Sequence, residues 1–142
     1  MAQRIWQTSY KENDRRMRIP ETIGYIHEPT DLQCGQAVLA MITGTDTKTV
    51  CRTLGNDRET SFKEMRSYLS RYGIKTGSSR KEAKTASDLP EICILSLETP
   101  RCWHWSLYVR GTFYDPEHGV MTDFPECARK YYWELADETE MI

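Results

Sequence analysis

Residues Asp31 to Gly44 read DLQCGQAVLAMITG, and this stretch places a cysteine directly before a run with helical periodicity. Counted from Cys34, apolar side chains recur at i+4, i+7 and i+8, which is the spacing of one buried helix face. These side chains are Val38, Met41 and Ile42. The pattern therefore predicts a helix that begins at Cys34.

The position of Cys34 has two interpretations. A thiol in the first turn of a helix lies near unpaired backbone N–H groups and the positive end of the helix dipole, and both favour the thiolate. Cys34 is then a candidate nucleophile. The alternative is structural, because free cysteine is among the most buried residue types and could simply open a packed helix face. The rest of the chain has to separate the two.

The composition is that of one soluble domain. A chain of 142 residues with 39% hydrophobic residues can bury a core without disulfides or metals. The net charge is only −2, from 19 basic and 21 acidic residues, so no basic field indicates a nucleic-acid partner. No window approaches the roughly 18 apolar residues of a membrane span, and the N-terminus has no apolar signal segment. We therefore expect a cytoplasmic protein with no nucleic-acid or membrane partner.

The five cysteines do not form a recognisable framework. Their number is odd, their spacing is irregular and no C-x-x-C pair occurs, which argues against both a disulfide scaffold and a zinc ribbon. Cys102 and His104 could share a metal, but two ligands without a second pair are weak evidence. We expect no metal and no cofactor.

The N-terminal segment differs from the rest of the chain. Residues 1–26 are polar, with a basic patch at Arg15, Arg16 and Arg18 and two aromatic side chains, Trp6 and Tyr10, before Pro20 breaks the segment. We interpret this segment as an arm, either solvated and partly ordered or docked on the body or a partner. Residues 27–142 are expected to form the domain.

Two further helices follow the Cys34 helix. Asp46 can cap a short helix that runs through Leu54 and ends at Gly55. Ser61 and Glu64 have the S-x-x-E spacing of a capping box, and apolar residues at helical spacing follow until Gly73. Residues 77–87 are almost entirely polar and are expected to form a surface loop beside a short strand or turn.

The second half of the chain reads as a sheet. Residues 92–97 are a nearly continuous apolar run, typical of a central strand covered on both faces. Residues 103–109 alternate, Arg110-Gly111 is a hairpin turn, and 112–115 form the returning strand. Asp123 can cap a C-terminal helix. Helices followed by an antiparallel sheet predict an α+β fold.

The hairpin brings two candidate site residues together. A two-residue turn at 110–111 places Ser106 opposite Asp115, and His104 on the same face as their diagonal neighbour. His104 could then act as base for Cys34, with Asp115 to orient it. A one-residue slip would move Asp115 to the other face, with Glu117 as the fallback acid. Alternatively, His104 is a structural sheet histidine and Asp115 only a strand stop.

Three segments carry a family resemblance. They are CGQAVLAM (34–41), SFKEMRSYLSRYGI (61–74) and HWSLYVRGTFYDPEHG (104–119). Together they resemble the papain-like cysteine peptidases of the bacteriocin-processing type, a group that includes the leader-peptidase domains of ABC exporters. The resemblance covers about residues 27–120. It implies a papain-like fold, with N-terminal helices packed on a C-terminal antiparallel sheet.

The resemblance also assigns roles. It makes Cys34 the nucleophile, His104 the general base and acid, and Asp115 the orienting carboxylate. It implies a peptide or protein substrate. Gly35, Trp103 and Trp105 are candidates for substrate binding, although aromatic residues in a hairpin more often belong to the core.

The oxyanion site departs from the family. The family has Gln at the position of Glu28, and Asp at the position of Gln33. An ionised Glu28 would repel a developing oxyanion, whereas a protonated Glu28, or a neighbour such as His27 or Gln33, could donate a hydrogen bond.

Three functions stay open. The first is a cysteine peptidase or thiol hydrolase that cleaves an amide or peptide bond through a thioester. The second is a deamidase or acyl transferase that uses the same three residues. The third is a catalytically impaired scaffold that acts as a protein-binding or inhibitor module. The substrate and the oligomeric state do not follow from the sequence.

Overall fold

Helix α1 spans Cys34–Thr43 in the computed structural model, which describes residues 19–137 of the chain. The predicted start at Cys34 is confirmed. The helix ends at Gly44, whose φ of 69° lies in the left-handed region that glycine adopts without strain. Nine of its ten residues are buried, because α1 packs between the other helices and the sheet.

Helix α2 (Thr47–Leu54) follows after a short turn. The side chain of Asp46 accepts a hydrogen bond from the Thr49 N–H, and Gly55 ends the helix with a φ of 66°. Both the predicted cap and the predicted end are confirmed, because they depend on local geometry.

Helix α3 spans Phe62–Ser70 and carries the predicted capping box. Ser61 accepts from the Glu64 N–H, and the Glu64 carboxylate accepts from the Ser61 N–H. The helix proper ends at Ser70, and turns carry the chain to Gly73, three residues beyond the end of the helix.

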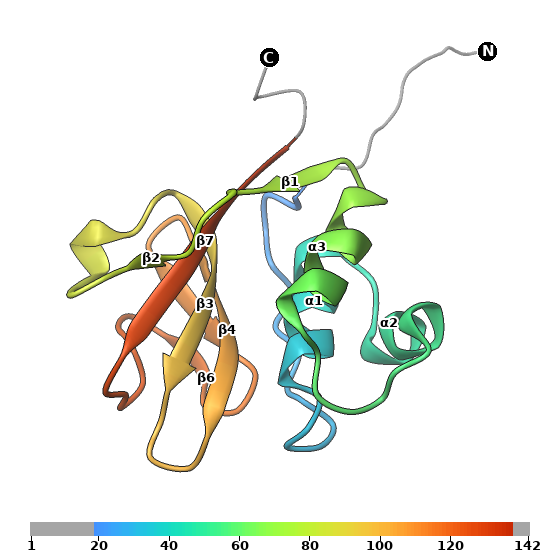
Figure 1. The fold of residues 1–142 in the computed structure, drawn as a ribbon, viewed down its shortest axis with the longest axis horizontal. Coiled ribbons are helices and arrows are strands. Elements are labelled where there is room, and N and C mark those ends of the chain that lie inside the picture. Colours follow the sequence, from blue (N-terminus) through green and yellow to red (C-terminus); the bar gives the residue numbers. More distant parts are fainter. Residues whose placement is uncertain (1–18, 138–142) are drawn as a thin grey trace.

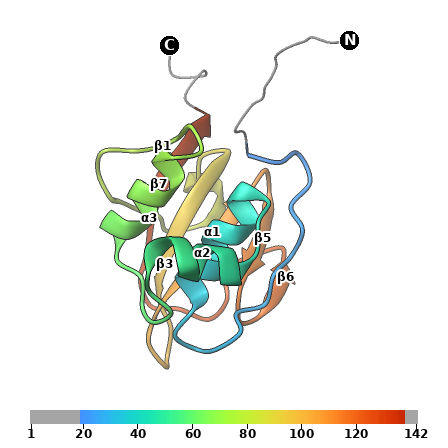
Figure 2. The same ribbon diagram turned by 90° about the vertical axis from the view of Figure 1, so that its right-hand side faces the viewer.

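After α3 the chain forms a seven-stranded sheet in which every pairing is antiparallel, with one short 3-10 helix at Ala86–Asp88. The order is β1-β7-β3-β4-β5-β6, and β2 pairs with β7 beside this path. Figure 1 shows the three helices gathered on one side of the sheet. In Figure 2 the helices lie in front and the sheet lies behind them. The strands are β1 (Ile74–Thr76), β2 (Lys81–Glu82), β3 (Ile92–Glu98), β4 (Trp103–Val109), β5 (Thr112–Asp115), β6 (Gly119–Met121) and β7 (Lys130–Asp137).

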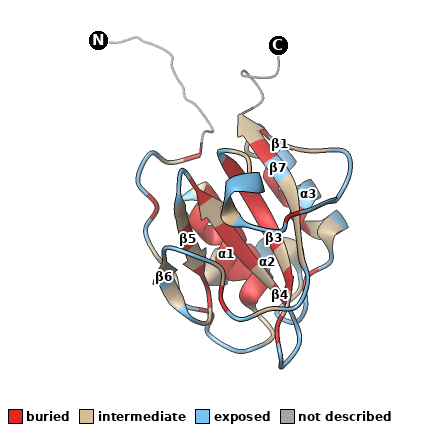
Figure 3. Cartoon of the chain, turned by 90° about the vertical axis from the view of Figure 1, so that its left-hand side faces the viewer, coloured by how far each residue is buried: buried red, intermediate tan, exposed pale blue. Residues whose placement is uncertain are grey.

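Strand β3 lies in the middle of the sheet and separates two apolar clusters. Ile94 points into the core between sheet and helices, whereas Leu95 packs with Phe113 on the opposite face. Both faces of β3 are therefore buried, which confirms the prediction from its continuous apolar run (Figure 3).

The predicted C-terminal helix is wrong. Residues 123–129 are irregular, and residues 130–137 form β7, which pairs with β3 along one edge and with β1 and β2 along the other. Trp133 of β7 stacks on Phe62 of α3, with ring centroids 4.1 Å apart. The unpaired edge of β3 and this aromatic contact outweigh the helical spacing of the segment, because aromatic residues suit a strand equally well.

The N-terminal arm is described only in part. Residues 1–18, with Trp6, Tyr10 and the basic patch, lie outside the described residues. Ile19 and Ile23 are buried in the core between helices and sheet. The domain boundary at residue 26 stays a prediction. Within residues 19–137, none of the helices has the length and apolar character that crossing a membrane requires.

Candidate active site

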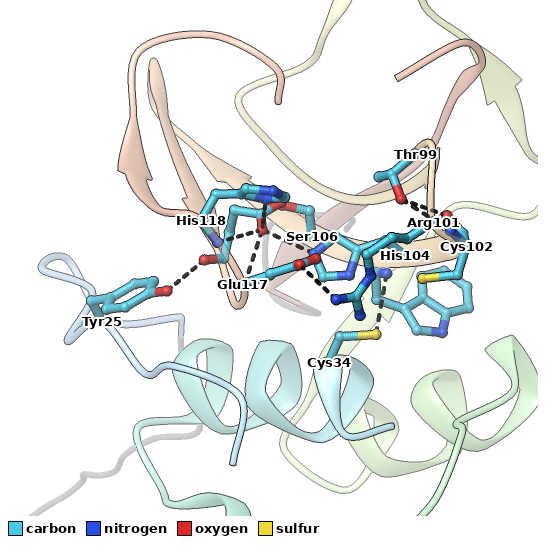
Figure 4. Close-up of polar contacts among 11 residues, drawn as sticks. Tyr25, Cys34, Thr99, Arg101, Cys102, His104, Ser106, Glu117 and His118 are labelled. Atoms are coloured by element: carbon cyan, nitrogen blue, oxygen red, sulfur yellow. Dashed lines mark hydrogen bonds and ion pairs between the residues drawn. The ribbon is translucent and has the colours of Figure 1, made fainter. Parts of the chain in front are cut away.

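The Cys34 thiol lies at the start of α1 and faces strand β4. It is 9% exposed, and its Sγ accepts a hydrogen bond from the Trp105 backbone N–H at 3.4 Å. Figure 4 shows the thiol pointing from the helix toward the strand that carries His104. At the first helical position the backbone N–H groups have no acceptor one turn earlier, so they can stabilise negative charge nearby.

His104 and Asp115 meet across the β4–β5 hairpin. Leu107 pairs with Tyr114 and Val109 with Thr112, which is the predicted register. His104 Nε2 lies 2.9 Å from Asp115 Oδ1. Since Asp115 occupies Nε2, the ring nitrogen left to interact with the thiol is Nδ1.

Asp115 is held by an extensive set of donors. Its Oδ2 accepts from the Ser106 hydroxyl at 2.8 Å, and its Oδ1 accepts from the N–H groups of Glu117 and His118 at 3.0 Å each. The His118 ring also lies against Oδ1, with Nδ1 at 2.9 Å. The carboxylate is fully buried, so these donors replace the water that it has lost.

The electrostatics of this pair follow from its geometry. Burial by itself lowers the pKa of His104, but hydrogen bonds to Asp115 and Cys34 outweigh it and raise the pKa to about 10. Burial likewise opposes ionisation of Asp115, yet the His104, Ser106 and His118 contacts hold its pKa well below the usual range. At neutral pH the geometry therefore favours an imidazolium paired with the ionised Asp115 carboxylate.

Glu28 reaches the same place from the loop before α1. Its carboxylate, the Cys34 Sγ and a His104 ring nitrogen all lie within 4.8 Å of one another. Burial is the main reason that the pKa of Glu28 is raised, and His104 partly opposes it. The Glu28 Oε1 atom finds no hydrogen-bond partner among the described residues.

Two hydrogen bonds to backbone carbonyls hold this loop against the end of β5. The Glu28 N–H donates to the Pro116 carbonyl at 2.9 Å, and the Tyr25 hydroxyl donates to the Asp115 carbonyl at 2.6 Å. Glu28 is thus placed by contacts with residues about 90 positions later in the chain.

The other oxyanion candidates lie elsewhere. The Gln33 side chain donates through Nε2 to the Asp57 carbonyl at 2.9 Å, so its amide is engaged away from the thiol. His27 is exposed. Of the sequence candidates, only Glu28 is brought beside Cys34 and His104.

A pocket of about 180 Å³ opens beside the thiol. Trp103 is 49% exposed at its rim, whereas Trp105 is partly buried and donates through Nε1 to the Thr60 carbonyl at 2.8 Å. Gly35 contributes space, because a Cβ there would lie 2.7 Å from Thr60 Cβ. The pocket is lined by Asp31, Leu32, Cys34, Glu59, Thr60, Cys102, Trp103 and Trp105.

Two polar residues near the site were not found from the sequence. His118 contacts Asp115 because Asp115 begins a tight turn, and an Asp-Pro pair followed by a histidine at i+3 was the available signal. Arg101 lies between Asp31 at 3.7 Å and Glu117 at 3.4 Å. Glu117, the fallback acid, is therefore engaged with Arg101, and Asp115 is the carboxylate that contacts His104.

Comparison with known proteins supports the fold. No family model matches the chain, and no curated protein matches it in sequence. Among solved structures it is similar to a double glycine motif protease from an AMS/PCAT transporter, solved in complex with the leader peptide. The TM-score is 0.59 at 16% identity, over 84% of this chain and 94% of that chain. The chain therefore has the α+β fold of a double-glycine peptidase domain, which is the type that its sequence resembles.

Proposed function

We propose that the protein is a papain-like cysteine peptidase in which Cys34 attacks an amide carbonyl. The observation that carries this proposal is the meeting of three side chains from α1, β4 and β5 at one point, with His104 between the thiol and a buried carboxylate. A histidine with only a structural role in the sheet would need neither a neighbouring thiol nor an ion pair with a buried carboxylate.

The first half of the reaction follows from these positions. The Cys34 thiolate forms a C–S bond to the substrate carbonyl carbon, and the carbonyl π electrons move to oxygen. When the tetrahedral intermediate collapses, the C–N bond breaks and His104 gives its proton to the departing amine. Asp115 orients the ring and stabilises the imidazolium without taking its proton.

The second half regenerates the enzyme. Neutral His104 takes a proton from water, the hydroxide oxygen bonds to the thioester carbon, and the C–S bond breaks to release the acid and the thiolate. In a deamidase the first leaving group is ammonia, and in an acyl transferase an amine replaces the water. The same three residues serve all three reactions.

The oxyanion would form beside the first turn of α1. The Cys34 backbone N–H is one donor, because the helix leaves it without an acceptor. Glu28 is a second donor only when it is protonated, and its raised pKa extends the pH range over which that form is present. The pocket next to the thiol would hold the side chain or backbone beside the cleaved bond, and Trp103 would cover it.

Turnover of a fluorogenic peptide-amide library by the full chain tests the proposal. We expect release that disappears in Cys34→Ala and His104→Ala. Cys51→Ser is the control, because Cys51 lies on α2 and is not among the residues that line this pocket. Release that persists in both Cys34→Ala and His104→Ala would refute the proposed nucleophile.

A second candidate function rests on Glu28. An ionised carboxylate beside the thiol opposes a developing oxyanion and would leave a scaffold that binds peptides without cleaving them. In that case the folded wild type releases no product from the library, yet it binds peptides as tightly as Cys34→Ala does.

A further inference from the structure

Three side chains of types that bind metals lie close together at the N-terminus of α1. Glu28 comes from the preceding loop, Cys34 from the helix and His104 from β4, and their donor atoms all lie within 4.8 Å of one another. Their exposed fractions are 6%, 9% and 3%. The set does not form a sequence motif, because Glu28 and Cys34 are 6 positions apart and Cys34 and His104 are 70 positions apart.

The donor types and spacing fit zinc. Thiolate, imidazole and carboxylate are the three protein ligands of Zn²⁺, which takes them at about 2.0–2.3 Å in a tetrahedron. Neighbouring donors of such a tetrahedron are about 3.3–3.7 Å apart, so shifts of about 1 Å would bring the present side chains around one ion. Hard cations such as Mg²⁺ prefer oxygen ligands only.

The surroundings of His104 match those of a metal ligand. Zinc-bound histidines usually donate their second ring N–H to a carboxylate, which fixes the tautomer and the direction of the free nitrogen. Here His104 Nε2 bonds Asp115 at 2.9 Å, and the Ser106 hydroxyl in turn holds that carboxylate at 2.8 Å. Nδ1 is thereby directed toward Cys34.

Glu28 supplies an independent indication. Its Oε1 is buried without a hydrogen-bond partner among the described residues, and its carboxylate faces the thiol and the imidazole. A buried polar atom without a partner costs free energy, and coordination to a cation would satisfy it. A glutamine at this position would be a weaker ligand, because its amide is neutral and zinc sites take their oxygen ligands from Asp and Glu.

The fourth coordination position can stay open. The pocket of about 180 Å³ adjoins Cys34, so a water molecule could complete the tetrahedron from that side. Metal binding would therefore not require the helix and the sheet to separate.

We propose that Cys34, His104 and Glu28 bind one Zn²⁺ ion, which switches off the nucleophile reversibly. Zn²⁺ takes Cys34 as the thiolate, His104 as the neutral imidazole and Glu28 as the carboxylate, so any protons on Sγ, Nδ1 and the Glu28 carboxyl are released to solvent as the bonds to zinc form. The thiolate is then no longer available to attack a carbonyl. Binding of the metal stands on its own, whereas the switching of activity rests on the proposed peptidase function.

A neighbouring cluster is the main competitor. His104, Glu117 and His118 also lie within 4.8 Å of one another. Its members already have partners, since His118 Nδ1 and His104 Nε2 contact Asp115 and Glu117 pairs with Arg101. It also lacks a thiolate, which makes the two sites spectroscopically distinct.

Co²⁺ titration of the full chain under a non-thiol reductant tests the metal site directly. We expect one equivalent to give a thiolate-to-cobalt charge-transfer band in the near ultraviolet, which Zn²⁺ displaces. The band should be absent in Cys34→Ala and unchanged in Cys102→Ser and His118→Asn. In competition with a chromogenic chelator, Glu28→Gln should bind Zn²⁺ at least about 10-fold more weakly than wild type.

The outcomes separate the metal site from the peptidase. A band that survives Cys34→Ala, a band lost in His118→Asn, or equal Zn²⁺ affinity of wild type and Glu28→Gln would overturn the site. If the band behaves as expected and the library assay shows turnover, Zn²⁺ should abolish it and a chelator restore it. Turnover that continues with the site saturated would overturn the switch. A protein with no turnover at all would refute only the proposed function, because the cobalt band does not depend on it.

Discussion

His104 Nε2 lies 2.9 Å from Asp115 Oδ1, and the two side chains are 3% and 0% exposed. A charged pair this deep in the protein is costly unless each remaining polar atom is satisfied. Asp115 meets that condition through Ser106, His118 and the backbone of the following turn. The relationship fixes the ring, and it gives the thiol of Cys34 a preorganised cationic partner.

Alkylation should single out Cys34 despite its burial. At about pH 6 an ordinary thiol with a pKa near 8.5 barely reacts with iodoacetamide, whereas a thiolate paired with imidazolium does. Intact mass with peptide mapping should show one fast adduct on Cys34 and slow labelling of the exposed Cys102. The fast adduct should vanish in His104→Ala. Equal labelling rates for both thiols would show that Cys34 is not activated.

Asp115→Asn should lower kcat for amide cleavage by about 10²–10⁴, because an amide no longer stabilises the imidazolium or selects its tautomer. His118→Asn is the matched control, since His118 contacts the same oxygen from the solvent side and is 41% exposed. We expect it to cost about tenfold or less. Steady-state kinetics on folded variants, checked by circular dichroism, measure both, and equal losses would mean that Asp115 does not act through His104.

Glu28→Gln should raise kcat/KM at neutral pH, by about 10–100-fold, because an amide N–H donates to an oxyanion that an ionised carboxylate repels. The raised pKa of Glu28 sets the pH dependence of this gain. As pH falls and Glu28 becomes protonated, wild type recovers a donor and the ratio between variant and wild type should shrink toward one. A pH profile of kcat/KM for both proteins measures this ratio. A gain that grows toward acid pH would contradict the assignment.

Gly35→Ala should destabilise the protein by about 1–3 kcal/mol, although alanine is the better helix former. Its Cβ would lie 2.7 Å from both Cβ and Oγ1 of Thr60 and 3.2 Å from Trp105 Cδ1. Chemical denaturation measures the loss. Thr60→Gly in the same chain should recover part of it, whereas Thr60→Ser, which keeps both close atoms, should not. If Gly35→Ala were as stable as wild type, Thr60 and Trp105 would have to move to make room for the added Cβ at no cost in stability.

The His104 and Asp115 pair should also appear in the pH dependence of stability. The pKa of His104 is raised to about 10 in the folded protein, so its contribution is complete below its ordinary pKa of about 6.5. That contribution is lost as pH rises from about 6.5 to 10. The free energy of unfolding of wild type should fall over this window more steeply than that of His104→Gln. Parallel curves for the two proteins would mean that the pair is not charged.

Local sequence was sufficient for the helices and for one hairpin. The caps at Asp46 and Ser61 satisfy N–H groups only three residues away, so nearby residues specify where these helices begin. The two-residue turn at Arg110 and Gly111, both with positive φ, sets the register of β4 and β5. From that register the approach of His104 to Asp115 follows by alternation alone.

Long-range packing settled the rest. Residues 130–137 became a strand because the edge of β3 and the ring of Phe62 offered partners that helical spacing cannot reveal. Glu28 lies beside the thiol because Pro116, far along the chain, accepts its N–H. Side chains separated by dozens of residues meet only after the chain has folded, and the energy of their meeting is a property of the packed protein rather than of any segment.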